Sequence, residues 1–549
     1  MARLDRLGPR AKEVAHVGAA IGREFAYELL IAVADHSDAE LHTALEQLSG
    51  AGLVFFRGTP PAATFLFKHA LVQDAAYGTL PRGRRRQLHA KIAEVLAQQF
   101  PHTVEAEPEV LAHHCSEAGL AAQAADYWQQ AGQRALARSA ATEAVTQLER
   151  GLNVLQSLPR DYERHRREVA LQVLLGQALI GTKGPAAPET GRVYARASEL
   201  CRELGDMPEF FPALYGQHVF HFERAELDRA LEVALEFLRL AHEQGDATAT
   251  VTGHRLVAAA LCHLGRFLEA RSHCEEGLAL SDPVRDRTSC LFYAFDSRTG
   301  CLNRLAHALL ALGYPDQARA WARQALIHAR ELAHSLTLAE ALDRTSNIYQ
   351  ILGDRSTARE LAEELIALAT EQGFPLWSSM AMVVIGSVMA DDRRVDDGLA
   401  QICEGISILG ATGSDVFSPY LLALLASAHR RADQVEAGLA RVNDALDRVD
   451  RTGGRWFEAE LHRVRGELLL VTPAPRAAEA SFRRALTVAR EQSARMWELR
   501  AAISLARLWR DQNKRTEARD LLAPVYGWFT EGFDTPDLKE AATLLAELN

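Results

Sequence analysis

Six polar side chains occupy matching positions in a series of helical repeats, and together they could bind a polar ligand by charge and hydrogen bonding. When the small residue of each second helix is taken as the reference, all six fall on the outward face of the first helices of neighbouring repeats. They are Arg255, Asn303, His307, Asp343, Asn347 and Gln350. One patch of this kind would bind a protein, a peptide or a small effector. The alternative is an ordinary solvated helix surface, since exposed polar residues are the norm.

The sequence has no motif for covalent or phosphoryl-transfer chemistry. It contains no GxxxxGK[ST] phosphate loop, no GxSxG and no HExxH, and the segment Gly181–Gly184 has the wrong spacing for a phosphate loop. His113, His114 and Cys115 are adjacent. Adjacent histidines point to different faces of a helix, so we expect one core and one surface histidine here and not a metal site. The chain is therefore predicted to be non-catalytic, with no cofactor and no metal.

Composition places the chain among soluble cytoplasmic proteins. Its 549 residues exceed one ordinary domain, 48% of them are hydrophobic, and the net charge is −11. The longest apolar run, Met380–Ala390, is too short to cross a bilayer, so no membrane partner is expected. No secretory signal is visible at the N-terminus. The seven cysteines form no CxxC pair, which suits free thiols in a reducing compartment. They are Cys115, Cys201, Cys262, Cys274, Cys290, Cys301 and Cys403.

A small residue recurs every 40 residues, with apolar residues four and seven positions later. The small positions are Ala318, Ala358, Gly398, Gly438, Ala478 and Ala518, and upstream the register continues through Thr190, Ala230 and Ala270 with extra residues before Thr190 and Ala318. This spacing is one face of a helix, on which the small residue lets a neighbouring helix approach closely. A fixed period near 40 predicts a mainly α solenoid of stacked helix pairs.

Two further signals support helix pairs. Trp128, Gly132, Ala144 and Leu148 fit the tetratricopeptide pattern, although the usual unit has about 34 residues and this one has 40. Glycines recur at the far end of each unit, where a helix C-cap belongs. They are Gly205, Gly245, Gly373, Gly413 and Gly453.

The N-terminal region is different. Helices are expected over Pro9–Ala20, Ala26–Ala34, Ser37–Leu48, His69–Thr79 and Arg82–Gln99, and Leu53–Phe56 and Thr64–Phe67 read as a β-hairpin. Helices followed by a hairpin suggest a winged-helix domain. We therefore predict a winged-helix-like domain over 1–105, the first helical repeats over 106–160, a superhelix over 161–530 and a capping helix over 531–549.

The segment Phe67–Asp74 resembles the Met-His-Asp motif in the winged-helix region of STAND-class signalling ATPases. His69 matches the motif histidine, which the resemblance places against the nucleotide of a preceding ATPase module, whereas Lys68 and Ala70 depart from the motif. The alternative is that His69 caps the following helix. More widely, the chain resembles the C-terminal part of bacterial predicted ATPases with tetratricopeptide repeats, many of which carry an N-terminal adenylate/guanylate cyclase domain. The segments that resemble it are Met1–Gly8, Ile21–Phe25, Phe67–Arg86, Gly454–Leu461 and Arg515–Lys539.

Three functions follow as hypotheses. The first is a non-catalytic signal-transduction module that binds a protein, peptide or small effector in the groove of the superhelix. The second is the regulatory half of an ATPase or cyclase whose catalytic modules lie on another chain or are missing, since Met1 could be an internal start. The third is a transcriptional regulator whose Arg82–Arg86 cluster contacts DNA, but the acidic net charge makes DNA an unlikely partner.

Overall fold

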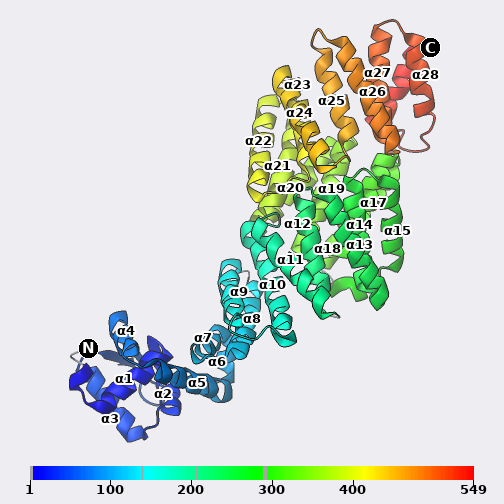
Figure 1. The fold of residues 1–549 in the computed structure, drawn as a ribbon. Coiled ribbons are helices and arrows are strands. Elements are labelled where there is room, and N and C mark those ends of the chain that lie inside the picture. Colours follow the sequence, from blue (N-terminus) through cyan, green and yellow to red (C-terminus); the bar gives the residue numbers. More distant parts are fainter. Residues whose placement is uncertain (1–3, 139, 206, 289–292, 549) are drawn as a thin grey trace. The chain divides into compact units, whose positions relative to one another are not determined.

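A computed structural model describes residues 4–138, 140–205, 207–288 and 293–548. Its contacts divide the chain into two compact units. The first consists of residues up to 182 together with 196–209, and the second consists of 183–195 together with 210–549. The prediction of a mainly α chain built from helix pairs is confirmed (Figure 1). Cys290 lies outside the described residues.

The first part of unit 1 combines helices with a small antiparallel sheet. Its elements are a 3-10 turn (Leu4–Arg6), α1 (Pro9–Ile21), β1 (Glu24–Ala26), α2 (Tyr27–Val33), α3 (Asp38–Gly50), β2 (Val54–Arg57), β3 (Thr64–Phe67), α4 (Ala70–Gly78) and α5 (Arg82–Gln99). The backbone N–H of Ser37 donates to Glu40 Oε2 at 3.1 Å, as the capping-box sequence of α3 predicts. The predicted hairpin is present as β2 paired with β3.

The sheet contains a strand that the sequence did not reveal. β1 pairs antiparallel with β3, so the strand order is β1-β3-β2. Ala26, predicted to begin a helix, is the last residue of this strand. Phe25 faces Phe65 across the pair, and their rings stack with centroids 5.8 Å apart. Three residues are too few to show the alternation that identifies a strand in a sequence. The contact of Phe25 with Phe65 therefore determines the position of β1 in the sheet.

Further helices follow α5 along the chain. They are α6 (Pro101–Ala106), α7 (Pro108–Ala118), α8 (Ala121–Ala137), α9 (Ala141–Leu155), α10 (Tyr162–Lys183) and α11 (Pro188–Leu204). Helix α10 ends at the boundary between the units, and α11 is divided, with 188–195 in unit 2 and 196–204 in unit 1. Trp128 is buried and its indole N–H donates to Ser116 Oγ at 3.0 Å. Within α7, His114 is buried and His113 is exposed, which is the arrangement predicted for two adjacent helical histidines.

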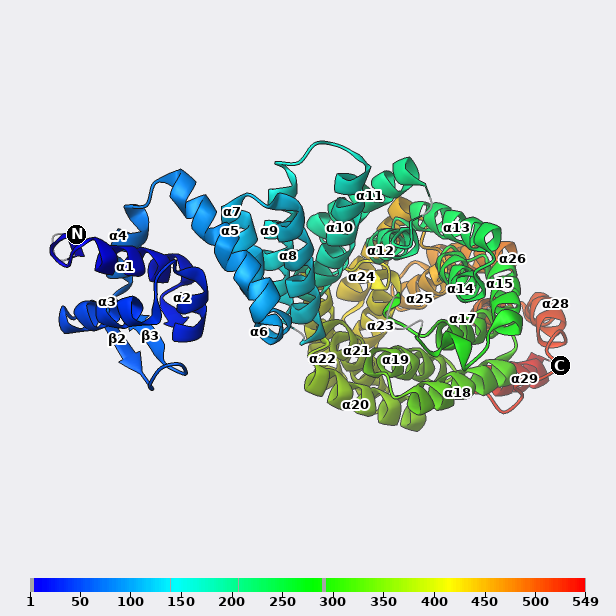
Figure 2. The same cartoon turned by 90° about the horizontal axis from the view of Figure 1, so that it is seen from below.

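Unit 2 is a superhelix of helix pairs. The first helices of the pairs are α12 (Phe210–Glu223), α14 (Ala247–His263), α17 (Ser297–Leu312), α19 (Ser335–Ile351), α21 (Pro375–Asp391), α23 (Ser418–Arg431), α25 (Glu458–Leu470) and α27 (Arg495–Asp511). The second helices are α13 (Leu227–Gln244), α15 (Phe267–Leu280), α18 (Pro315–Leu332), α20 (Arg355–Gln372), α22 (Val395–Thr412), α24 (Val435–Thr452), α26 (Pro475–Glu491) and α28 (Arg515–Tyr526). A 3-10 turn (Arg285–Thr288) precedes α17, and α29 (Pro536–Leu548) packs on the last pair. In Figure 2, α14, α17 and α19 lie on the inner side of the ring, and α15, α18 and α20 lie on the outer side.

The 40-residue register corresponds to the contact between the two helices of a pair. All six small positions from Ala318 to Ala518 are buried. The two helices α21 and α22 approach each other closely, because a Cβ added to Gly398 would lie 2.5 Å from the carbonyl oxygen of Gly386. The repeated glycines end helices in the left-handed conformation, as predicted for C-caps; Gly245 after α13 has φ 66° and Gly373 after α20 has φ 71°.

Successive turns of the superhelix contact one another through loop backbone and charged side chains. The amide of Asp415 donates to the carbonyl of Glu223, and the amide of Trp456 donates to the carbonyl of His263. Further along, Arg500 donates to the carbonyl of Ile351, 149 residues earlier in the chain. Arg319 pairs with Asp534 at 3.1 Å. These contacts close the superhelix on itself, so the inner faces of its first helices are enclosed.

Within the described residues, the structure has no helix that is both long and apolar enough to cross a membrane.

The close approach of α21 and α22 gives a first prediction. Gly398→Ala should lower the free energy of unfolding by about 1–3 kcal/mol, because the added methyl group meets backbone atoms that cannot rotate away. Gly410→Ala in the same helix is the matched control. A Cβ there meets nothing within 4 Å, so it should raise stability by up to about 1 kcal/mol through helix propensity. Urea denaturation measures the free energy of unfolding of both variants. Equal stability of the two would contradict the close packing of α21 and α22.

Candidate functional site

The six polar residues singled out from the sequence all come from first helices of unit 2, and these helices lie on the inner side of the ring (Figure 2). Arg255 comes from α14, Asn303 and His307 come from α17, and Asp343, Asn347 and Gln350 come from α19. These three first helices are neighbours, and α17 packs against both α14 and α19. The superhelix therefore brings residues from three repeats to one wall, as the register predicts.

Burial separates these residues from an ordinary solvated surface. Arg255 is 6% exposed, Asn303 1%, Asp343 0% and Asn347 2%, whereas His307 and Gln350 are half-buried. The solvated-surface alternative is thus wrong for four of the six. The physical reason is the contact between superhelical turns, which covers positions that an open solenoid would leave in water.

Several polar atoms on this wall have no hydrogen-bond partner among the described residues. They are Arg255 Nε and Nη2, both side-chain amide atoms of Asn303, both carboxylate oxygens of Asp343, and Asn347 Oδ1. Asp343 Oδ2 does lie 3.2 Å from Arg344 Nη1, and the side chain of Asn347 also interacts with this carboxylate, so the charge of Asp343 has partners. Buried polar groups in native proteins are nearly always hydrogen-bonded, so this concentration needs a cause.

His307 and Gln350 differ, because their side chains are engaged within the protein. His307 Nδ1 donates to the carbonyl of Asn303 at 2.9 Å. Gln350 Nε2 donates to Ser387 Oγ at 3.3 Å, and its Oε1 accepts from the Tyr420 hydroxyl at 2.9 Å. Burial lowers the pKa of His307 to about 3, so the ring is neutral near pH 7. These two residues shape the wall and offer little to a ligand.

Two arginines that the sequence analysis did not select, Arg304 and Arg344, also lie in the interior of the superhelix. Arg304 on α17 lies 3.4 Å from Glu340 on α19, and the guanidinium of Arg344 lies 4.4 Å from the centroid of the Phe417 ring. Arg304 and Arg344 are both buried. A signal was present in the sequence, because Arg304 and Arg344 occupy the same repeat position, one residue after Asn303 and Asp343 respectively.

Two small cavities adjoin these residues inside the superhelix. One has a volume of about 70 Å³ and is lined by Arg255, Glu340 and Tyr215 among others. The other has a volume of about 30 Å³ and is lined by Asn347, His307, Trp456 and Trp497 among others. Arg304, Arg344 and Phe417 border both cavities and therefore stand between them. Each cavity can hold water or a small polar group. Asn303, Asp343 and Gln350 are not among the residues that line them.

Charges of both signs meet in this interior. Arg255, Arg304 and Arg344 are positive, and Glu223, Glu340 and Asp343 supply carboxyl groups. Burial raises the pKa of Glu223 and of Asp343, because the low-dielectric interior disfavours the ionised form. Burial lowers the pKa of Arg304 for the same reason, so the interior disfavours charge of either sign, and a ligand that supplies a counter-charge or hydrogen-bond partners would offset this cost.

His69 and the basic cluster of unit 1 lie outside this interior. His69 is exposed and occupies the N-cap position of α4, but its side chain makes no capping hydrogen bond. In the cluster, Arg84 pairs with Glu13 at 3.3 Å and Arg86 donates to the carbonyl of Ala118. Arg85 donates to the carbonyls of Leu80 and Gly78. These intramolecular bonds give the cluster a structural role within unit 1.

The chain matches no known protein-family profile. An uncharacterized protein of Rhizobium meliloti (strain 1021) is 26% identical over 513 residues, which is 92% of this chain and 49% of that protein. The chain thus spans about half the length of this curated relative.

Several solved structures are similar to this chain. A Rap protein complexed with competence and sporulation factor has 13% identity and a TM-score of 0.48, covering 68% of this chain and 99% of that one. A STAND protein with a tetratricopeptide repeat sensor from Pyrococcus horikoshii has 13% identity and a TM-score of 0.33, covering 70% of this chain and 60% of that one. The quorum sensor NprR from B. thuringiensis has 11% identity and a TM-score of 0.39, covering 66% of this chain and 98% of that one.

The unpartnered amide of Asn303 gives a second prediction. Asn303→Leu should raise the free energy of unfolding of the ligand-free protein by about 1–3 kcal/mol, because it removes two buried polar atoms that lack partners. Gln350→Leu is the matched control and should be destabilising, since it breaks the bonds to Ser387 and Tyr420. Chemical denaturation measures both. A loss of stability in Asn303→Leu equal to that in Gln350→Leu would show that Asn303 is satisfied in the native protein.

The raised pKa of Asp343 gives a third prediction, on pH dependence. The unfolded carboxyl loses its proton near its ordinary value of 3.8 while the folded one retains it. The stability that this group contributes is therefore present at low pH and is lost as pH rises through the folded pKa. Asp343→Asn cannot ionise and should be more stable than the unsubstituted protein at pH 7, with the difference shrinking toward pH 4. Urea denaturation across this range tests it; a destabilised Asp343→Asn at pH 7 would mean that the pairing with Arg344 dominates.

Proposed function

We propose that unit 2 is a ligand-sensing module of a bacterial signal-transduction protein, and that it binds a small polar effector or the terminus of a peptide partner in the interior of the superhelix. The observation that carries the proposal is one set of cavity-lining residues with buried, unpartnered polar atoms. They are Arg255 (Nε and Nη2), Glu340 (Oε2), Arg344 (Nε) and Asn347 (Oδ1).

Energetics support a ligand at these positions. A buried polar atom without a partner costs about 1–3 kcal/mol, and the cost is higher for charged groups. Folded proteins therefore retain few of them, and each calls for an explanation. A ligand that supplies the missing partners recovers this cost on binding. Ordered water can fill the same positions in the free protein, which makes release of that water part of the binding reaction.

The lining residues favour particular ligand chemistry. The guanidinium of Arg255 contacts Tyr215, but its Nε and Nη2 donors lack partners and match a carboxylate. Glu340 and Asn347 present acceptors, which match an amine or amide N–H. Aromatic rings around them, including Tyr215, Phe417 and Trp456, supply apolar contact. An amino acid, an acylated amino acid or a peptide with a free carboxyl terminus combines these features.

Cavity size limits how such a ligand enters. Volumes of about 70 and 30 Å³ admit only a small group without movement of the protein. A larger peptide needs the turns of the superhelix to separate, which breaks loop contacts such as the one between Asp415 and Glu223. Binding would then change the spacing of the turns, and that change is a means of signalling.

We further propose that this sensor regulates an ATPase or adenylate/guanylate cyclase module on a preceding segment or another chain. Two observations support it. The curated relative is about twice as long as the matched region, and the segment Phe67–Asp74 resembles the motif that faces the nucleotide in STAND-class ATPases. The order of α1 to α3, with β1 between α1 and α2 and the β2–β3 hairpin following, supports a winged-helix domain in that role.

The fourth prediction tests ligand binding. Free amino acids, acylated amino acids and tripeptides with free or amidated carboxyl termini are screened by thermal unfolding, and hits are measured by calorimetry. We expect a probe with a free carboxylate to bind and its amidated counterpart to bind at least about tenfold more weakly, because it cannot pair with Arg255. Arg255→Met and Asn347→Leu should abolish binding.

Glu363→Gln on the outer helix α20 is the control for these variants. Glu363 is exposed, so its substitution should leave both affinity and unfolding temperature unchanged. If none of the probes binds, or if Arg255→Met and Glu363→Gln bind a hit equally well, the interior is not the ligand site.

A further inference from the structure

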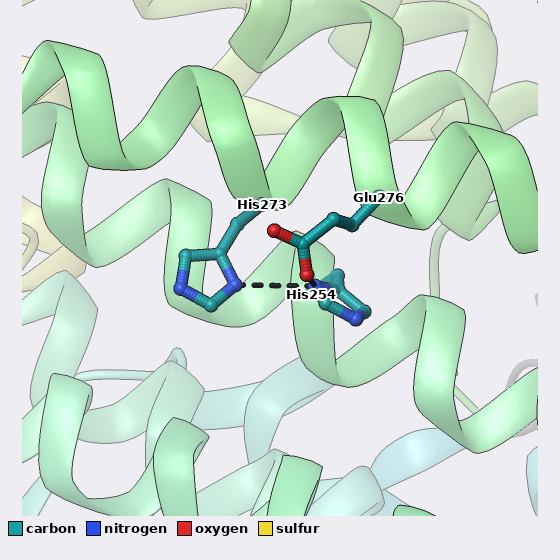
Figure 3. A group of neighbouring side chains, drawn as sticks. All are labelled: His254, His273 and Glu276. Carbon is teal, nitrogen blue, oxygen red and sulfur yellow. Dashed lines mark hydrogen bonds and ion pairs between the residues drawn. The ribbon is translucent and has the colours of Figure 1, made fainter.

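Three potential metal ligands meet between α14 and α15, on the side of α14 away from the interior cavities. His254 comes from α14, and His273 and Glu276 come from α15 (Figure 3). Their ligand atoms all lie within 4.8 Å of one another. His254 Nδ1 lies 3.1 Å from His273 Nδ1 and 3.9 Å from Glu276 Oε2. The sequence analysis did not select them, because they come from two helices and form no local motif.

We propose that His254, His273 and Glu276 bind a divalent transition-metal ion of the Zn²⁺ class. Zn²⁺ takes imidazole nitrogen and carboxylate oxygen at about 2.0–2.2 Å, and two such ligands at a tetrahedral angle are about 3.3–3.6 Å apart. The distances of 3.1 and 3.9 Å from His254 Nδ1 bracket this value. Three protein ligands leave one position for water, as in open zinc sites.

The surroundings prepare these atoms for an ion. His254 is 2% exposed, so its ring is held in place. Ser272 Oγ donates to Glu276 Oε1 at 2.9 Å, which leaves Oε2 facing His254 and orients the carboxylate in the way that outer-shell partners orient ligands.

The repeat register is what brings the two helices close enough. A Cβ added to Gly277 on α15 would lie 3.1 Å from His254 Cβ, so a larger residue there would push α14 away. Gly277 stands seven residues after Ala270, at the third position of the 40-residue pattern. Arg255, the next residue on α14, lines the interior cavity. An ion at His254 would thus fix the helix that carries Arg255, although the metal site does not depend on the proposed ligand.

Cobalt binding tests the proposal, because Co²⁺ in a tetrahedral site absorbs visible light and can be displaced by Zn²⁺. The purified protein, freed of metal with a chelator, is titrated with Co²⁺ and then with Zn²⁺. We expect visible absorption at one equivalent and its loss on adding Zn²⁺. His273→Ala and Glu276→Gln should each weaken binding by more than about tenfold, because even changes to outer-shell partners cost this much.

Controls separate a metal site from its alternatives. His273 is half-buried and Glu276 is exposed, so both variants should keep the circular dichroism spectrum of the unsubstituted protein. His429 lies outside the proposed metal site and contacts Gln434. His429→Ala should therefore leave the affinity for cobalt unchanged. A sulfur-to-cobalt charge-transfer band would show that a cysteine binds the ion. If no visible absorption appears, no tetrahedral cobalt site forms, and His254 and His273 are simply joined by an N–H···N hydrogen bond. Either result, or unchanged affinity in both ligand variants, overturns the proposal.

Discussion

The contact between successive turns of the superhelix is the constraint on which the interior depends. Backbone hydrogen bonds from Asp415 to Glu223 and from Trp456 to His263 join loops that are about five helix pairs apart. The bond from Ser414 to Glu223 spans 191 residues. An open solenoid would leave the inner faces of α14, α17 and α19 in water. Because the turns touch, Arg255, Asn303 and Asp343 are removed from solvent, and their hydrogen-bonding requirements become an energetic property of the fold.

This enclosure creates opposing demands within unit 2. Apolar residues of the second helices stabilise each pair, and small residues such as Ala318 and Gly398 permit the close packing. The polar residues of the first helices lower stability, because charges such as Arg304 and Asp343 are costly to bury. Destabilising groups that are concentrated in one place are expected to serve a function. Binding of a ligand with matching donors and acceptors is such a function, and the cavities around Arg344 are consistent with it.

The sequence predicted the helix pairs well, because they depend on local periodicity. The 40-residue register located the second helices, and the capping sequence at Ser37 located the start of α3. It also assigned the six polar residues to one wall. What it could not predict was their burial, since this depends on contacts between residues more than a hundred positions apart. Strand β1 was missed because three residues carry no periodic signal. The histidine pair was missed because His254 and His273 meet only after two helices pack against each other.

The central claim is that polar groups enclosed by the stacked turns await a ligand. A high-resolution crystal structure of the protein as purified tests it most directly, through the electron density beside Arg255, Arg344 and Asn347. We expect ordered density there, from water molecules or from a retained ligand, within hydrogen-bonding distance of their unpartnered atoms. Side chains that satisfy one another without any such density, or turns so far apart that bulk solvent fills the interior, would contradict it.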